Sequence, residues 1–201
     1  MWKVSLSNAY RVPSNATAFT TNKSEKEGYR LRSSDMEALK YVKNLKALDI
    51  GHCAITSLDF LKGMDLEFLI LSHNNITDIS ILGEMPHLQY LEIFRNNITD
   101  ISPLANCPEL IDLNITITKV TDLTPLDACP NLERLWLCTY MQTTVPDEAN
   151  KEHFRQTHPN CILRDDISHP THLWREHPRY EFYRKNLLSH NWVSFSEMDQ
   201  Q

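Results

Sequence analysis

Histidines and carboxylates near the C-terminus are the first residues of this 201-residue sequence that could do chemistry. His169, His172 and His177 follow closely on Asp165 and Asp166. Imidazole nitrogens and carboxylate oxygens are common zinc ligands, so a metal-binding or enzymatic role for this tail is one hypothesis. However, the spacing matches no metal site that we can justify, and prolines interrupt the segment. We therefore interpret these residues as surface histidines of a polar tail and predict no metal site.

A second set of carboxylates recurs at a fixed interval. Asp78, Asp100 and Asp122 are each 22 residues apart, and they would lie about 5 Å apart if each belonged to a successive, stacked strand unit. Calcium bound between them is one alternative. A simpler interpretation is that each carboxylate caps the N-terminus of a short helical turn, where backbone N–H groups need acceptors. We predict three separate turn caps.

The sequence contains none of the common catalytic patterns. It has no nucleophile elbow, phosphate-binding loop or HExxH motif, so we predict no catalytic residue and no cofactor. The cysteines are odd in number and form no CxxC pair: Cys53, Cys107, Cys129, Cys138 and Cys161. Because Cys107 and Cys129 are 22 residues apart, we interpret them as small buried hydrophobes in register, with a bridge between adjacent coils as the alternative. We expect five free thiols.

The same interval governs the apolar residues. The leading leucines are separated by one step of 21 and three steps of 22 residues: Leu45, Leu66, Leu88, Leu110 and Leu132. Within "LEI", residues 91–93, apolar residues alternate with Glu92, which is strand periodicity. One such unit cannot bury its apolar side alone, so the units must stack as coils of a solenoid. We predict five parallel strands from the repeats, a sixth near Ile162, and an inner ladder of Leu48, Leu69, Leu91, Leu113 and Leu135.

The motif LxxLxLxxNxIxDIxPL is similar to the 22-residue leucine-rich repeat of bacterial internalin-like proteins. "LQYLEIFRNNITDISPL", residues 88–104, matches it throughout, whereas Cys53 and Thr118 replace the asparagine in other copies. The resemblance covers roughly residues 35–165. It implies an α/β fold: a right-handed leucine-rich repeat solenoid with a parallel β-sheet on its concave face, short helical or 3-10 turns on its convex side and a helical C-terminal cap. It also implies that Asn74 and Asn96 satisfy backbone groups in the turn.

The ends of the chain depart from the repeat. We divide the sequence into an N-terminal extension, a solenoid with its caps and a His- and aromatic-rich C-terminal extension: residues 1–32, 33–165 and 166–201. We predict helices over the following segments: 33–44, with Ser34 or Asp35 as its cap; within the capping segment 146–165, ending at His158-Pro159; and 179–188. We expect the C-terminal extension to pack on the end of the solenoid, and a short partner-binding motif is the alternative.

Charge and hydropathy narrow the class of partner. Residues 45–145 hold 5 basic and 13 acidic residues, a net charge of −8, which argues against nucleic acid because phosphate backbones need a basic surface. The longest apolar runs are too short to span a bilayer. The family resemblance favours a bacterial, secreted or cell-surface location, and the cytoplasm stays open because no signal peptide is visible.

The outward positions of the predicted strands form the candidate partner site. Aromatic and acidic residues dominate it: Phe68, Ile70, Tyr90, Glu92, Phe94, Asp112, Asn114, Arg134 and Trp136. An exposed apolar group of this size usually marks an interaction, and aromatic residues are common binding hot spots. Alternatively, these side chains pack on one another or lie beneath a terminal segment. We predict a monomeric, non-catalytic protein–protein recognition module whose partner has a basic rim and an apolar centre.

Overall fold

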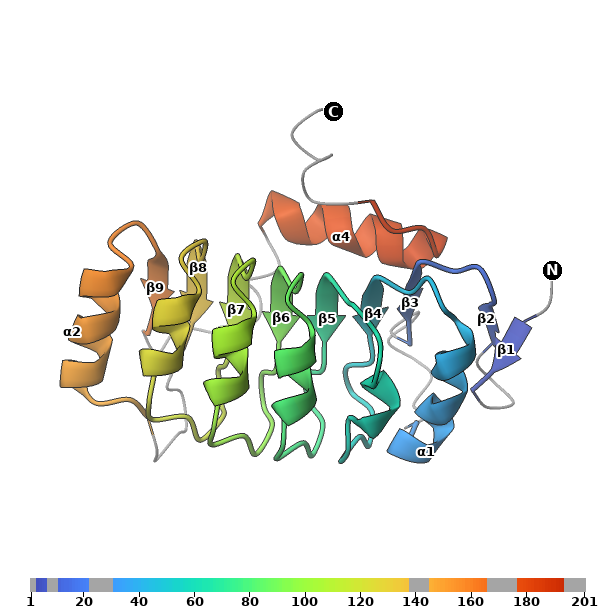
Figure 1. The fold of residues 1–201 in the computed structure, drawn as a ribbon, viewed down its shortest axis with the longest axis horizontal. Coiled ribbons are helices and arrows are strands. Elements are labelled where there is room, and N and C mark those ends of the chain that lie inside the picture. Colours follow the sequence, from blue (N-terminus) through green and yellow to red (C-terminus); the bar gives the residue numbers. More distant parts are fainter. Residues whose placement is uncertain (1–2, 7–10, 22–30, 138–144, 166–176, 194–201) are drawn as a thin grey trace.

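The computed structural model describes residues 3–6, 11–21, 31–137, 145–165 and 177–193 (Figure 1). The strands are β1 (Lys3–Ser5), β2 (Arg11–Pro13), β3 (Ala18–Thr20), β4 (Ala47–Asp49), β5 (Phe68–Ile70), β6 (Tyr90–Glu92), β7 (Asp112–Asn114), β8 (Arg134–Trp136) and β9 (Ile162–Arg164). The helices are α1 (Ser33–Met36), α2 (Glu148–Thr157) and α4 (Pro178–Ser189), and the 3-10 helices are η1 (Glu37–Tyr41), η2 (Asp59–Leu61), η3 (Ser80–Glu84), η4 (Ser102–Asn106) and η5 (Thr124–Ala128).

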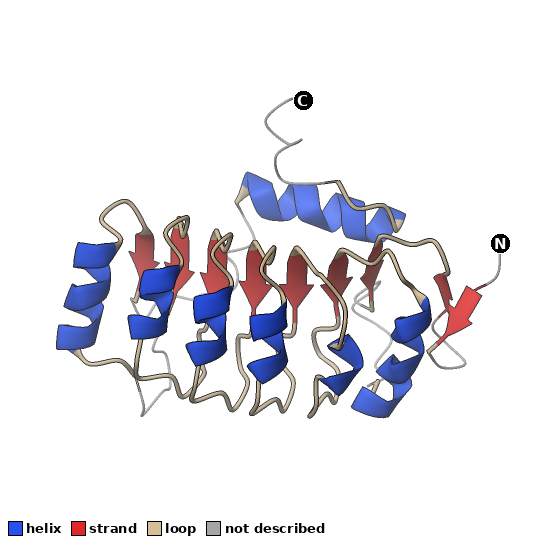
Figure 2. Cartoon of the chain, viewed as in Figure 1, coloured by secondary structure: helices blue, strands red, loops and turns tan. Residues whose placement is uncertain are grey.

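Strands β3 to β9 form one parallel sheet in chain order. The short helices of the coils lie on the opposite side of the solenoid (Figure 2). In the sheet Leu91 lies between Leu69 and Leu113, and these three side chains are fully buried. The leucines point to the inner face of the sheet, which packs on the convex turns, and the other face is the concave face. The predicted solenoid, its five repeat strands and the strand at Ile162 are therefore confirmed.

Asparagine side chains connect neighbouring coils inside the turns. Asn74 accepts a hydrogen bond from the backbone N–H of Ile55 (3.0 Å) and donates to the carbonyl of Leu71 (2.9 Å). Asn96 repeats this one coil later, accepting from the N–H of Ile76 and donating to the same Leu71 carbonyl, both at 3.0 Å. A buried backbone group without a partner costs about 1–3 kcal/mol, so these amides stabilise the turns. The role that the family resemblance implies for both asparagines is confirmed.

The recurring aspartates cap the convex turns. The Oδ1 atoms of Asp78, Asp100 and Asp122 accept hydrogen bonds from the backbone N–H groups two residues later, at 2.8, 2.7 and 2.9 Å. These bonds hold the pKa of Asp78 and of Asp122 below the usual value, because they favour the charged carboxylate. The three predicted caps are confirmed.

Four cysteines fall in the described part of the chain, and all four are free thiols: Cys53, Cys107, Cys129 and Cys161. Cys138 lies outside the described residues. Cys107 and Cys129 are fully buried, and each Sγ donates to a backbone carbonyl of the preceding coil, on Leu82 and Leu104 respectively, at 3.3 Å. The interpretation of this pair as small hydrophobes in register is confirmed.

The N-terminal extension contains three strands that the repeat pattern does not predict: β1 and β2 form a separate two-stranded sheet, and β3 joins the main sheet. Strand β3 pairs in parallel with β4 and sets Phe19 beside Leu48, so a fully buried phenylalanine extends the inner ladder. The segment "AFT" carries no leucine motif, and the pairing is long-range, which explains why the repeat pattern does not reveal it. The helix expected at 33–44 is α1 followed by η1, with Met36 and Leu39 buried. The expected cap is wrong: the N-cap is Arg32, and Asp35 accepts a hydrogen bond from the Arg32 backbone N–H (2.7 Å).

Helix α2 closes the C-terminal end of the repeats. Its Asn150 side chain accepts a hydrogen bond from the backbone N–H of Leu123 (2.8 Å), and Phe154 is buried against the core. The helix ends at Thr157, with His158 as its C-cap. The predicted helical cap is confirmed. Among the helices that the structure describes, none has the length and apolar content needed to cross a membrane.

Candidate functional site

The nine residues predicted to contact a partner are brought together on the concave face or at its edge. Eight of them lie in strands β5 to β8, and Phe94 is the second residue after β6. Every one of them is at most 6% exposed: Phe68, Ile70, Tyr90, Glu92, Phe94, Asp112, Asn114, Arg134 and Trp136. The expectation that the aromatic side chains are exposed is therefore wrong: Phe68, Tyr90 and Trp136 form one buried cluster with helix α4, and the Phe94 ring lies beside His73. This is the alternative in which these side chains pack on one another or lie beneath a terminal segment. Their contact with a partner stays a prediction.

Aromatic rings form the centre of the contact with α4. Phe68 of β5 stacks on Tyr90 of β6, with ring centroids 4.3 Å apart. Tyr183 of α4 lies 4.8 Å from Phe68 and 5.4 Å from Tyr90, and Trp192 stacks on Tyr183 at 5.0 Å. Leu187, one helical turn after Tyr183, is also buried in this cluster. Aromatic pairs of this kind contribute about 0.5–1.5 kcal/mol each beyond the area they bury, so α4 is packed specifically.

A buried ion cluster holds the N-terminal end of α4. Asp112, which is fully buried, accepts from Nε of Arg134 (2.6 Å) and from Nη1 of Arg179 (2.8 Å). Arg179 also pairs with Glu133. Burial by itself would lower the pKa of Arg179, but the negative charges of Asp112 and Glu133 raise it. Because an unpaired buried charge is very costly, each member of this cluster depends on the others.

The C-terminal end of α4 is fixed to the first strands of the sheet. His190 ends the helix in a left-handed conformation (φ 59°), and its Nδ1 lies 3.2 Å from the carbonyl oxygen of Ala18 in β3. The Trp192 indole donates to Glu67 (2.8 Å), and the Trp192 backbone N–H donates to Thr17 Oγ1 (2.6 Å). The helix thus crosses the strand direction, from β7, where Arg179 contacts Asp112, to β3 at its end (Figure 1).

Polar side chains beside the aromatic cluster are used within the protein. Tyr90 donates its hydroxyl to Glu92 (2.6 Å), and Ser72 donates to the other oxygen of the same carboxylate (3.1 Å). Burial, reinforced by the negative charge of Glu92, raises the pKa of Tyr90 well above its usual value, so this phenol stays a hydrogen-bond donor.

Two other buried polar atoms near this cluster differ. Asn114 Nδ2 and Thr116 Oγ1 are buried and have no hydrogen-bond partner within the described residues.

The C-terminal histidines do not assemble a site in the described part of the chain. His177 is the N-cap of α4, where its Nδ1 accepts from the backbone N–H of Arg179 (3.2 Å). Burial, followed by the charges of Arg134 and Arg179, lowers its pKa. His169, His172 and Asp166 lie outside the described residues. Across the ranges that the structure describes, no three His, Cys, Asp or Glu side chains are placed to hold a metal ion.

Comparison with known proteins identifies the repeat. A family model of paired leucine-rich repeats matches residues 65–106 and 86–128, and a single-repeat model matches residues 43–58. The chain therefore contains leucine-rich repeats over residues 43–58 and 65–128. No curated protein sequence matches it.

Solved structures with a similar solenoid include internalins of Listeria monocytogenes. Internalin C2 is 26% identical over 70% of this chain and 70% of its own, with a TM-score of 0.51. Internalin F is 23% identical over 80% of this chain and 52% of its own, with a TM-score of 0.52. A leucine-rich repeat protein of Leptospira interrogans is 24% identical, over 63% of this chain and 38% of its own, with a TM-score of 0.52. The last two likenesses concern the fold, and this chain spans about half the length of internalin F.

Leucine-rich repeat domains are typically protein-binding modules, and solenoid proteins use their concave surfaces for this purpose. In this chain, residues of the C-terminal extension occupy part of the concave surface. The predicted helix over 179–188 is confirmed, but it packs on the concave face rather than only on the end of the solenoid. One signal in the sequence could have indicated that the helix packs on the concave face. Tyr180, Tyr183 and Leu187 share one face of the helix, and without this helix the concave aromatic side chains would be exposed to solvent.

Proposed function

We propose that this protein is a non-catalytic recognition module whose concave face binds a helix presented by a protein partner. The observation that carries the proposal is α4 itself. It is a helix of 12 residues held on this face by stacked aromatic rings at its centre and by an arginine between two carboxylates at one end. A surface that binds such a helix within the chain has the chemistry to bind a similar helix from another chain.

The chemistry of α4 matches the partner expected from the sequence. Tyr183 and Leu187 supply an apolar centre, and Arg179 supplies the basic group at the rim. On the solenoid side, the surrounding repeats carry a net charge of −8. A partner helix with one arginine and an aromatic face is therefore favoured over an acidic helix, and its association should slow as salt rises.

Binding in this way requires exchange with α4. A helix in the same chain competes at an effective concentration that can be on the order of millimolar, so an external helix binds only when α4 is loosened or when the partner makes further contacts. The ion cluster is the natural point for loosening, because Arg179 joins the first turn of α4 to Asp112 of β7 and to Glu133, the residue before β8. The unpaired polar atoms of Asn114 and Thr116 lie on and beside β7 and offer a partner additional hydrogen bonds.

A peptide added in trans tests the proposal. The probe is a fluorescent peptide of residues 177–193, titrated into the full chain and into the Arg179→Glu variant, in which the new carboxylate would face Asp112 and Glu133. We expect at least tenfold tighter binding to Arg179→Glu than to the wild type, because α4 is released. Adding Tyr90→Ala to this background should weaken peptide binding by about 2 kcal/mol, the usual cost of removing an anchor.

The matched control is Arg184→Glu, which changes an exposed arginine of the same helix. It should bind the peptide as weakly as the wild type does. If the folded Arg179→Glu variant binds no more peptide than this control, the concave face does not accept an external helix and the proposal fails.

A further inference from the structure

One residue in each of four successive coils has a left-handed backbone although it is not glycine. These residues directly follow the outward strand positions: His52 (φ 57°), His73 (φ 57°), Arg95 (φ 54°) and Ile117 (φ 52°). Glycine adopts this conformation without steric cost, whereas other residues adopt it uncommonly. Three of the four are basic residue types, in a repeat region whose net charge is −8. A left-handed backbone costs free energy at a residue other than glycine, and here it recurs at four equivalent positions. Such a conformation suggests that the side chains at these positions have a function.

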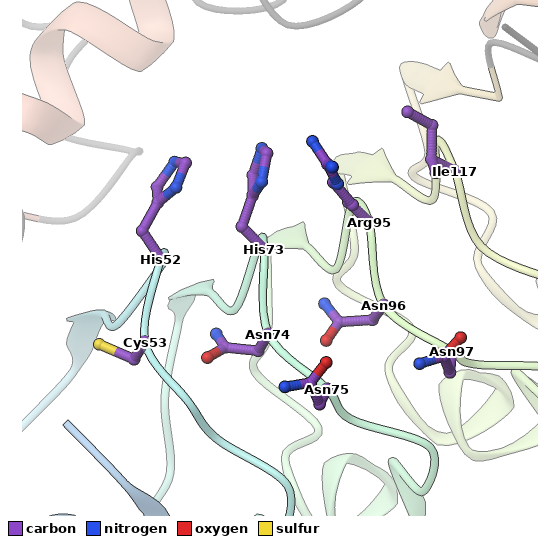
Figure 3. Close-up of a pocket in the computed structure, with 9 residues that line it drawn as sticks. All are labelled: His52, Cys53, His73, Asn74, Asn75, Arg95, Asn96, Asn97 and Ile117. Atoms are coloured by element: carbon purple, nitrogen blue, oxygen red, sulfur yellow. The ribbon is translucent and has the colours of Figure 1, made fainter. Parts of the chain in front are cut away.

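The row is ordered by its own packing. The imidazole rings of His52 and His73 are stacked with centroids 4.1 Å apart, and the edge of the buried Phe94 ring contacts His73 at 4.6 Å. Figure 3 shows the side chains of His52, His73, Arg95 and Ile117 extending in the same direction from neighbouring coils. The row is therefore a regular ridge with a step of about 5 Å per coil.

Arg95 is the fixed positive charge of this ridge. Its backbone N–H is bound to the carbonyl of Thr116 (2.9 Å), which holds the residue in place. Its side chain is exposed, and within the described residues its guanidinium forms no ion pair. By contrast, Arg134 and Arg179 are both buried against Asp112. Arg95 thus differs from the arginines that hold the closed concave face.

A cavity of about 690 Å³ opens along the ridge. Besides the ridge itself, amide side chains line it: Asn74, Asn75, Asn96 and Asn97. Asn74 and Asn96 are committed to backbone groups, but Asn75 and Asn97 are exposed. Among the described residues that line the cavity there is no carboxylate. The guanidinium of Arg95 carries a positive charge and only donors, and the exposed amides of Asn75 and Asn97 add further N–H donors, which suits an anion.

We infer that this cavity binds a carboxylate side chain from an acidic segment of a protein partner. Arg95 provides the planar pair of donors that matches a carboxylate, while the exposed amides of Asn75 and Asn97 provide further donors. His52 and His73 form the wall of the cavity beside Arg95. The inference rests on the proposed recognition function but uses a different surface from the α4 contact. Because the whole chain has a net charge of −6, a strongly acidic segment would be repelled, and a segment with one or two carboxylates fits best.

Nuclear magnetic resonance on the isotope-labelled full chain tests this inference. The probe is the blocked peptide acetyl-Gly-Glu-Gly-Glu-Gly-amide, and the glutamine version of the same peptide is the neutral comparison. We expect the glutamate peptide to shift the side-chain resonances of His52, His73 and Arg95, and the glutamine peptide to leave them unchanged. Arg95→Gln should weaken binding at least fivefold, and Arg184→Gln, an exposed arginine on α4, should leave it within twofold of the wild type.

Three outcomes would overturn the inference. Equal binding of both peptides would show that the carboxylate is not recognised, and unchanged affinity in a folded Arg95→Gln variant would remove Arg95 from the site. Shifts produced by inorganic phosphate but not by the glutamate peptide would assign the cavity to phosphate instead. None of these results depends on Arg179 or Tyr90, so failure here is distinct from failure of helix exchange on the concave face.

Discussion

The two faces of the sheet differ in how their residues repeat from one coil to the next. On the inner face, each coil contributes the same residue type at the same position, and Leu69, Leu91 and Leu113 repeat one contact. On the concave face, one column changes from Phe68 to Tyr90 to Asp112 to Arg134, and no two coils are alike. The inner face is covered by the turns of its own coils. The concave face is covered in part by α4, whose Arg179 is 67 residues from Asp112 along the chain.

This difference predicts two kinds of cooperativity. A change on the inner face weakens contacts that every neighbouring coil shares, so it should lower the stability of the whole solenoid. A change in the α4 contact should first free one helix, because local opening needs less free energy than global unfolding. The following experiments separate these two behaviours.

The largest effect is expected for Leu91→Ala. Leu91 is fully buried between leucines of both neighbouring coils, and truncating such a residue costs about 2–5 kcal/mol. Urea unfolding followed by circular dichroism should register the loss as a shift of the whole transition. Leu188→Ala is the control, since Leu188 is 47% exposed and should cost less than about 0.5 kcal/mol. A shift below that level for Leu91→Ala would mean that the residue is not in the core.

Asn96→Ala should lower the free energy of unfolding by about 3 kcal/mol. The change removes the partner of the Ile76 N–H and of the Ile93 carbonyl, and each buried group left unpaired costs about 1–3 kcal/mol. The Leu71 carbonyl keeps its hydrogen bond from Asn74. The neighbouring Asn97→Ala is a matched control, because Asn97 is exposed. Equal stability of the two variants in urea would show that the asparagine ladder contributes nothing.

Arg179→Ala should weaken the contact of α4 with the sheet by about 2 kcal/mol, which is within the range for a hydrogen bond to a charged group. Asp112 keeps its bond to Arg134, so the effect should be concentrated in α4. Hydrogen exchange measured by mass spectrometry should be at least tenfold faster in α4 and unchanged in β5 to β7, with Arg184→Ala as the control. Equal acceleration along β5 to β7 would show that α4 and the solenoid unfold as one unit, and the comparison of the two faces would then not hold.

The smallest effect concerns the thiols of the inner face. Burial raises the pKa of Cys107 to about 11 and, together with the nearby Cys107, that of Cys129 to about 12. Both should therefore react slowly with a thiol reagent at pH 8, since the thiolate is the reactive form. As the pH rises from 9 towards 11, the unfolded chain loses these protons first, so the free energy of unfolding should fall.

Counting thiols in denaturant without reductant checks the cysteines of the whole chain. We expect five, and a count of three or fewer would indicate bridging or oxidation. Rapid reaction of Cys107 and Cys129 in the native protein would contradict their burial.

The sequence by itself determined the inner face and the turns. The spacing of Leu69, Leu91 and Leu113 required stacked coils, because a single coil cannot bury its apolar side. The capping role of Asp100 could also be predicted, because it serves backbone groups two residues away, whereas the role of Asn96 was implied by the family resemblance. In these cases the residue pattern recurs every 22 residues, so the structure of one coil predicts the structure of the next.

Only the tertiary structure decided what happens on the concave face. The sequence placed Phe68, Tyr90 and Asp112 there and indicated a helix that contains Arg179, but it did not bring these groups together. Strand β3 and the ridge of His52, His73, Arg95 and Ile117 were likewise not predicted. The contacts of α4 and of β3 occur once, between segments far apart in the chain. The ridge recurs from coil to coil, but it depends on a backbone conformation that the side-chain pattern does not encode. A periodic pattern specifies contacts between equivalent residues, whereas a single long-range contact depends on where the folded chain places its ends.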